Sequence, residues 1–124
     1  MKKVLLLSLV LCVALSCLLT SCGPKTQEGE KNITVKITAD GNTTTHQINT
    51  DALYLREALI EYFGEKLSFN SFDMVEVIDG IKADPGKGEW WMYDVDGTQA
   101  VKGVDTQPIA DGNVIDFYIT VFNP

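Results

Sequence analysis

The side chains that most often carry catalysis or hold metals are few in this sequence. Among 124 residues it has a single histidine, His46, and three cysteines, at positions 12, 17 and 22. A Ser-His-Asp triad needs a histidine beside a carboxylate, and a zinc site needs several imidazoles or thiols in one folded domain. The cysteines all lie in the N-terminal segment, and His46 lies in a polar stretch without a neighbouring carboxylate pattern, so we expect a solvated imidazole. The two carboxylates of a glycosidase are brought together only by the fold, so a sequence pattern does not reveal them. A compact domain with short loops, however, offers little cleft in which such a pair could bind a substrate. The sequence therefore favours a protein that is not an enzyme.

Cys22 is the residue whose surroundings predict covalent chemistry. Two lysines begin the chain, residues 4–19 are mostly apolar, and Leu19-Thr20-Ser21 precedes the cysteine. This is the pattern of a secretory signal peptide, too short for a stable membrane span. Its end resembles the bacterial lipobox, which implies diacylglycerol on the Cys22 sulfur, cleavage before Cys22 and acylation of the new N-terminus, as with palmitate. We expect residues 1–21 to be the signal and lipidated Cys22 to hold an extracytoplasmic protein at the bacterial membrane. Cys17 as the lipidated residue, and ordinary secretory cleavage nearby, are the alternatives.

The net charge of the chain after the signal segment limits the kinds of partner that it can bind. Two of the ten Lys and Arg fall in residues 1–21, which leaves 8 against 17 Asp and Glu, a formal charge of −9. A surface of this sign repels nucleic acid and anionic headgroups. We therefore expect no nucleic-acid partner, and membrane contact through the lipid alone.

The run Asp94-Val95-Asp96-Gly97 resembles the start of a calcium loop. It lacks the further oxygen ligands and the terminal Glu that such a loop places at fixed spacing. Asp-Gly is also a preferred pair for a tight hairpin turn. We expect a turn with solvated carboxylates and no resident metal or other cofactor.

The stretch Glu89–Gly97 holds two tryptophans, a methionine and a tyrosine before the Asp-Gly pair. Aromatic residues followed by such a turn are typical of a β-strand. Because strand side chains alternate between faces, Trp91, Tyr93 and Val95 share one face, which we expect to be the core.

The opposite face of the same strand is the candidate binding surface. Trp90 and Met92 point to that face, and Tyr118 and Phe122 join them if the last strand pairs in register. An aromatic surface left uncovered by a single helix suits a flat or apolar ligand. The alternative is that the connection over residues 98–110 folds across this face and covers it.

These residues must be positioned by a small domain. We expect a polar tether over residues 22–31 and one folded domain over residues 32–124. The predicted fold class is α+β, a two-layer β-grasp-like (ubiquitin-like) mixed sheet with one helix packed on one face. The expected elements are strands over 33–38, 43–48, 74–78, 90–95 and 114–122, a helix from about 52 to 63 with an N-cap among Asn49, Thr50 and Asp51 and an end at Gly64, a loop over 67–73 with two buried phenylalanines, and an irregular loop over 84–88.

Three motifs in this order suggest a family. They are Leu55–Leu59 (LREAL), Val77–Ala83 followed by Trp91–Gly97 (WMYDVDG), and Gly103 followed by Ile109–Ile115 (IADGNVI). Together they resemble the transcobalamin-like C-terminal domain, a small module that closes over cobalamin. Asp96 stands where the family often has Asn, and Gly112-Asn113 where it often has Gly-Asp; both changes keep turn chemistry.

The resemblance implies the fold and a ligand class. It covers roughly residues 33–122 and implies a binding module for cobalamin or a related corrinoid, without the large helical domain of the vertebrate carriers. Two functions therefore stay open. One is a surface lipoprotein that captures a corrinoid on Trp90, Met92, Tyr118 and Phe122; the other is a protein- or glycan-interaction module displayed to a surface protein partner.

Overall fold

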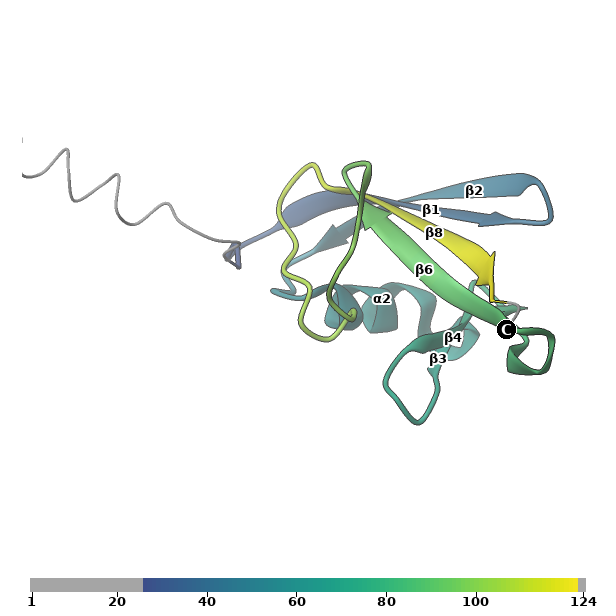
Figure 1. The fold of residues 1–124 in the computed structure, drawn as a ribbon. Coiled ribbons are helices and arrows are strands. Elements are labelled where there is room, and N and C mark those ends of the chain that lie inside the picture. Colours follow the sequence, from purple (N-terminus) through teal and green to yellow (C-terminus); the bar gives the residue numbers. More distant parts are fainter. Residues whose placement is uncertain (1–25, 123–124) are drawn as a thin grey trace, which may run out of the picture.

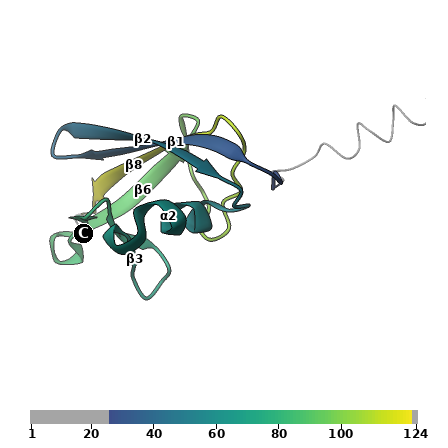
Figure 2. The ribbon, with the colours of Figure 1, turned by 180° about the vertical axis from the view of Figure 1, so that it is seen from behind.

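The computed structural model describes residues 26–122 as two layers (Figure 1). One layer is a five-stranded sheet, and the other combines helix α2 (Leu55–Phe63) with a small three-stranded sheet. Seen from behind, α2 and β3 lie together beneath the large sheet (Figure 2). The two-layer α+β fold is thus confirmed. The remaining elements are β1 (Lys31–Ala39), β2 (Asn42–Thr50), η1 (Gly64–Lys66), β3 (Ser68–Phe69), β4 (Val75–Ile78), β5 (Ile81–Lys82), η2 (Pro85–Lys87), β6 (Glu89–Val95), β7 (Thr98–Gln99) and β8 (Val114–Val121).

The large sheet has the strand order β2-β1-β8-β6-β7. Its first and last long strands, β1 and β8, are parallel neighbours, and the other pairs are antiparallel. A parallel pair needs a crossover, which the segment containing α2 supplies. This is the mixed, β-grasp-like arrangement expected from the sequence. Residues 74–78, expected as a third strand, contribute β4 to the separate sheet β3-β4-β5.

The core lies between the large sheet and α2. Every second residue of β1 points into it, as the alternating apolar pattern predicts, and Val35 is fully buried. Leu59 of α2 and Phe117 of β8 are also at most 1% exposed. Fully burying a side chain of this size stabilises the fold by roughly 1.5–3 kcal/mol. No helix among residues 26–122 has the length and apolar composition needed to cross a bilayer.

Helix α2 begins later than expected, and its first turn is satisfied by a distant segment. The predicted N-cap among residues 49–51 is wrong, because the N-cap is Tyr54 and makes no side-chain cap bond. Instead, the Leu55 N–H donates to the Gln107 carbonyl and the Arg56 N–H to the Val104 carbonyl, both at 2.9 Å. The first N–H groups of a helix have no partner within it, so these carbonyls replace a cap. The connection after β7 is thereby held against the start of α2.

His46 is not solvated as expected. Its side chain is 15% exposed and lies on the helix side of β2. Its Nε2 is 3.1 Å from a carboxylate oxygen of Asp79, and its Nδ1 is 3.1 Å from the Tyr62 hydroxyl. The ring also meets Tyr62 and Phe63 edge-on. His46 therefore joins β2, α2 and the β4–β5 turn.

The segment expected as a loop over residues 67–73 contains β3 and buries only one of its two phenylalanines. Phe69 is partly buried beneath the Arg56 guanidinium, 4.3 Å from its ring centre, whereas Phe72 is 78% exposed. The Asn70 side chain accepts hydrogen bonds from the backbone N–H groups of Phe72 and Met74. These bonds close a tight loop that turns Phe72 outward.

The N-terminal part of the described chain packs on the domain. Strand β1 begins at Lys31, which is fully buried and donates from Nζ to the Gly29 carbonyl at 2.8 Å. The Gln27 side chain accepts a hydrogen bond from the Asp111 N–H at 2.9 Å. Part of the expected tether is therefore attached to the fold. The expected signal peptide and Cys22 lie outside the described residues.

Candidate ligand-binding surface

The register of β6 and β8 brings the predicted binding residues to one face. Met92 lies directly opposite Tyr118, and Trp90 lies opposite Thr120. Since side chains two residues apart share a face, Phe122 follows Tyr118 on the same side, diagonal to Trp90. We call Trp90, Met92, Tyr118 and Phe122 the aromatic patch.

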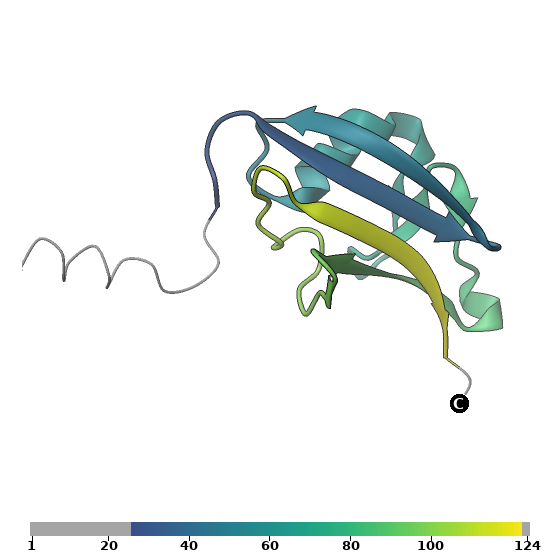
Figure 3. The same cartoon turned by 90° about the horizontal axis from the view of Figure 1, so that it is seen from above.

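The aromatic patch lies on the face of the sheet away from α2. Trp90, Met92 and Tyr118 are partly exposed, and Phe122 is 55% exposed. The connection over residues 98–110, the alternative cover for this face, is instead bound to the start of α2 and buries Val104 and Ile109 on that side. Figure 3 shows α2 behind the strands and the sheet in front. Among the described residues, the patch is therefore uncovered.

Tyr118 carries a polar contact at the patch. Its hydroxyl donates to a carboxylate oxygen of Asp94 at 2.9 Å. Partial burial raises the pKa of Tyr118 above its usual value, and the hydrogen bond and charge of Asp94 raise it further. The phenol therefore stays neutral and oriented at physiological pH, and Asp94 is not the freely solvated carboxylate that we expected.

Gly88 fixes the end of β8 that carries Phe122. The Phe122 N–H donates to the Gly88 carbonyl at 2.8 Å, and Gly88 has a φ of +73°. A Cβ at this position would lie 2.4 Å from the Phe122 carbonyl oxygen, so only glycine permits this approach.

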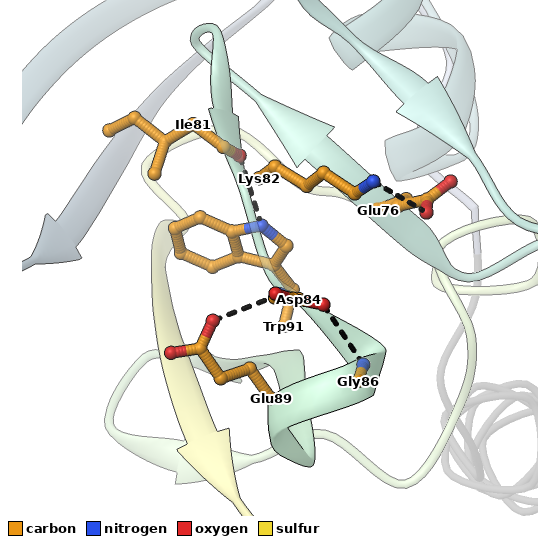
Figure 4. Close-up of polar contacts among 7 residues, drawn as sticks. All are labelled: Glu76, Ile81, Lys82, Asp84, Gly86, Glu89 and Trp91. Carbon is orange, nitrogen blue, oxygen red and sulfur yellow. Dashed lines mark hydrogen bonds and ion pairs between the residues drawn. The ribbon is translucent and has the colours of Figure 1, made fainter.

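The loop before β6 is more regular than expected. Residues 85–87 form the 3₁₀ turn η2, and the Asp84 carboxylate accepts from the Gly86 N–H at 2.9 Å (Figure 4). The Glu89 carboxylate accepts in turn from the Asp84 N–H at 2.9 Å. These groups satisfy one another within the loop, which leaves its polar atoms less available to a ligand than the sequence suggests.

The acidic turn after β6 is structural. Asp96 adopts a φ of +50° and Gly97 one of +83°, as a two-residue hairpin turn requires. The Asp96 carboxylate accepts from the Val114 N–H and the Asn113 side-chain amide, each at 2.7 Å. Its oxygens thus fasten the start of β8, although the residue itself is exposed. No cluster of three or more potential metal-ligating His, Cys, Asp or Glu occurs within residues 26–122.

A second surface, which the sequence did not predict, lies at the edge of β6. It is a groove of about 260 Å³ on the helix side of the sheet, between β6, the start of β4 and the segment after β7. We call it the edge groove. Its lining is mostly apolar and consists of Met74, Val75, Trp91, Met92, Tyr93, Ala100, Val101, Lys102, Gly103, Val104 and Phe117. The signal that could have revealed it is the long, Gly- and Pro-containing run after Thr98, which is unable to pair with the whole of β6.

Two buried side chains of β6 build the groove. The Tyr93 hydroxyl donates to the Lys102 carbonyl at 2.6 Å, which holds residues 100–104 beside the strand. The Trp91 indole N–H donates to the Ile81 carbonyl at 3.3 Å and so ties β6 to β5 (Figure 4). Nearby, Lys82 and Glu76 form an ion pair across β4 and β5 at 3.9 Å.

The fold and these surfaces define a small two-layer α+β module with an aromatic patch on one sheet face and an apolar groove at one sheet edge. The chain belongs to the family described as "Domain of unknown function (DUF4430)", whose model matches residues 51–120. No curated protein matches it.

The solved structures that share the fold include the following two. A protein from Ruminococcus gnavus ATCC 29149, described as a "putative metal binding protein", is 26% identical with a TM-score of 0.67, and the match covers 76% of this chain and 100% of that one. Haptocorrin in complex with Cbi is 11% identical with a TM-score of 0.64. That match covers 83% of this chain but only 28% of haptocorrin, and at this identity it shows likeness of fold alone.

Proposed function

We propose that the chain is a non-catalytic, ligand-binding lipoprotein that captures a corrinoid on the aromatic patch. The observation that carries this proposal is the register of β6 and β8, which gathers Trp90, Met92, Tyr118 and Phe122 on an uncovered sheet face. A flat ligand can stack on such a surface, and each aromatic contact adds about 0.5–1.5 kcal/mol beyond simple burial.

The ligand class rests on two supports. The sequence motifs resemble the transcobalamin-like C-terminal domain, and the solved haptocorrin structure that shares this fold contains Cbi. Most of haptocorrin has no counterpart in this chain, since the match covers 28% of it. A patch on an open sheet also contacts only one side of a ligand, whereas pockets bury 70–90% of it. We therefore expect micromolar rather than tight binding.

The membrane anchor is part of the proposal and rests on the sequence. The signal-like segment ends in Leu19-Thr20-Ser21-Cys22, the arrangement that a lipoprotein requires. Metabolic labelling of producing cells with a clickable palmitate analogue tests it. We expect incorporation into the wild-type chain and none into Cys22→Ser; equal labelling of both would assign the lipid elsewhere.

Spectral titration tests the ligand. The mature chain, residues 22–124 with Cys22→Ser, is titrated against cobalamin and cobinamide and the corrin absorption is followed. A saturable shift is expected, weakened at least about tenfold in Trp90→Ala and unchanged in Thr45→Ala, a control that lies on the same face at the far strand β2. No shift at about 1 mM corrinoid, where binding would be weaker than about 4 kcal/mol, would end the corrinoid assignment.

A protein-interaction module was the alternative from the sequence, and one observation favours it independently. Within residues 26–122, part of the β6 edge carries no neighbouring strand.

A further inference from the structure

Strand β6 pairs with β8 along its whole length. Among the described residues, its other edge has a neighbouring strand only near its C-terminal end. Strand β7 pairs with Asp94 and Val95 alone, and one further bond runs from the Ala100 N–H to the Tyr93 carbonyl at 3.0 Å. At the other end, the Glu89 N–H donates back to the Asp84 carbonyl. The middle of β6 therefore lies at an open edge.

Trp91 is the residue of this edge for which neither backbone group has a partner among residues 26–122. Hydrogen bonds from the Phe122 N–H to the Gly88 carbonyl and from the Asp96 N–H to the Val114 carbonyl show that even-numbered residues of β6 bond toward β8. In an antiparallel pair the intervening residues point their N–H and C=O outward. Among the described residues, neither the Trp91 N–H nor its C=O has a partner across the edge. Such an edge is a template for a further strand.

The edge groove lies beside this open edge and its mouth is apolar. Met74 is 37% exposed and Val101 is 96% exposed, and both line the groove. Phe72, two residues from Met74, is the other highly exposed apolar side chain of this loop. A groove next to a free strand edge offers backbone hydrogen bonds along the edge and a pocket for alternate side chains.

We propose that the edge groove binds an extended, basic segment of a partner protein, which adds to β6 as a strand at Trp91 and places an apolar side chain in the groove. The outward-pointing N–H and C=O of Trp91 can pair with a C=O and an N–H of an extended peptide backbone. The charge of the described domain as a whole favours a basic segment, because residues 26–122 carry 7 Lys and Arg against 17 Asp and Glu, although Lys102 lines the groove itself. The acidic excess disfavours a second copy of this chain, since pairing two β6 edges would bring like charges together.

The alternation of a strand also sets the sequence of the segment. Side chains on its groove side meet Trp91, Tyr93 and Val101, and those on the other side lie next to the open face with Asp94. Apolar residues should therefore alternate with lysine or arginine. The site is distinct from the aromatic patch except for Met92, which contributes to both.

The test uses the mature chain with Cys22→Ser and an acetylated, amidated peptide of about seven residues that alternates lysine and valine. We expect saturable binding in fluorescence anisotropy and slowed hydrogen exchange at the Trp91 amide. A peptide N-methylated on the residues facing β6 should bind at least about tenfold more weakly, because it cannot donate to the strand edge.

Matched variants test whether the peptide binds at the edge groove. Val101→Lys, at a nearly fully exposed position, should weaken peptide binding about tenfold by charge and lost apolar contact, whereas Ile60→Lys on the exposed face of α2 should leave it within about twofold. Trp90→Ala should leave peptide binding intact. Equal binding of the methylated peptide, an unprotected Trp91 amide, or equal effects of the two lysine variants would overturn the proposal. Concentration-dependent dimerisation that protects Trp91 would assign the edge to a second copy instead, and displacement of the peptide by corrinoid would assign it to the small ligand.

Discussion

Removing the hydroxyl of Tyr93 isolates one hydrogen bond that shapes the edge groove. Tyr93 is 8% exposed, and its hydroxyl donates to the Lys102 carbonyl at 2.6 Å. Tyr93→Phe keeps the ring and its packing against Phe117. The Lys102 carbonyl loses its partner, and because Lys102 itself is exposed, water can partly replace it. We expect a loss of about 1–1.5 kcal/mol, between the net value of a hydrogen bond and the cost of a buried unpaired group.

Urea unfolding followed by tryptophan fluorescence measures this loss, and Tyr118→Phe is the matched control. Tyr118 undergoes the same chemical change, but its bond to Asp94 lies on the open face, so we expect less than about 0.5 kcal/mol. A domain of this size should also show a midpoint temperature for Tyr93→Phe lower by roughly 4–8 °C per kcal/mol. If the two variants lose equal stability, the Tyr93 bond does not hold residues 100–104 as argued.

The stabilities of the wild type and of Tyr93→Phe should also differ in how they depend on alkaline pH. Burial, followed by the nearby charge of Asp105, raises the pKa of Tyr93 well above its usual value of 10.0. Above pH 10 the tyrosine ionises in the unfolded chain but stays protonated in the fold, so the contribution of Tyr93 to stability is complete below pH 10 and declines above it. The stability advantage of the wild type over Tyr93→Phe should therefore shrink as pH rises past 10. Parallel pH profiles for the two proteins would refute this reasoning.

Two other substitutions test residues that the fold depends on. Gly88→Ala should lower the free energy of unfolding by about 2–4 kcal/mol, because of the positive φ and the 2.4 Å approach of the new Cβ to the Phe122 carbonyl oxygen. Thermal unfolding measures this loss. A change below about 0.5 kcal/mol would mean that the backbone relaxes freely around the added methyl group. His46→Ala should lower the free energy of unfolding by about 1–3 kcal/mol, because it removes contacts to Tyr62 and leaves Asp79 without its partner. Chemical unfolding measures this loss. An unchanged midpoint would support the solvated histidine expected from the sequence.

Local patterns predicted the parts of the fold that depend on neighbouring residues. The alternation in β6 correctly placed Trp91 and Tyr93 in the core, and it placed Trp90 and Met92 on the opposite face. The Asp-Gly pair at residue 96 predicted its hairpin turn, because only a few residues accept positive φ at low cost. The candidate binding residues followed from the same alternation.

Contacts between distant segments could not be read in this way. The start of α2 depends on the Val104 and Gln107 carbonyls, about 50 residues further along, which no capping pattern near Tyr54 reveals. His46 meets Tyr62 and Asp79 only after the sheet and helix have packed. The edge groove has one local signal, the Gly- and Pro-containing run after Thr98, but its shape depends on packing, since it forms where three separate segments meet beside an unpaired strand edge.

The bond between Gln27 and Asp111 determines how the proposed anchor would orient the domain. The five Cα–Cα steps from Cys22 to Gln27 span at most about 18 Å, so a lipid on Cys22 would keep the Asp111 end near the bilayer. Strand β8 starts at that end and runs for eight residues, roughly 26 Å, toward Phe122. The molecule would then stand upright on the membrane, with its aromatic patch near the tip that meets diffusing solutes first.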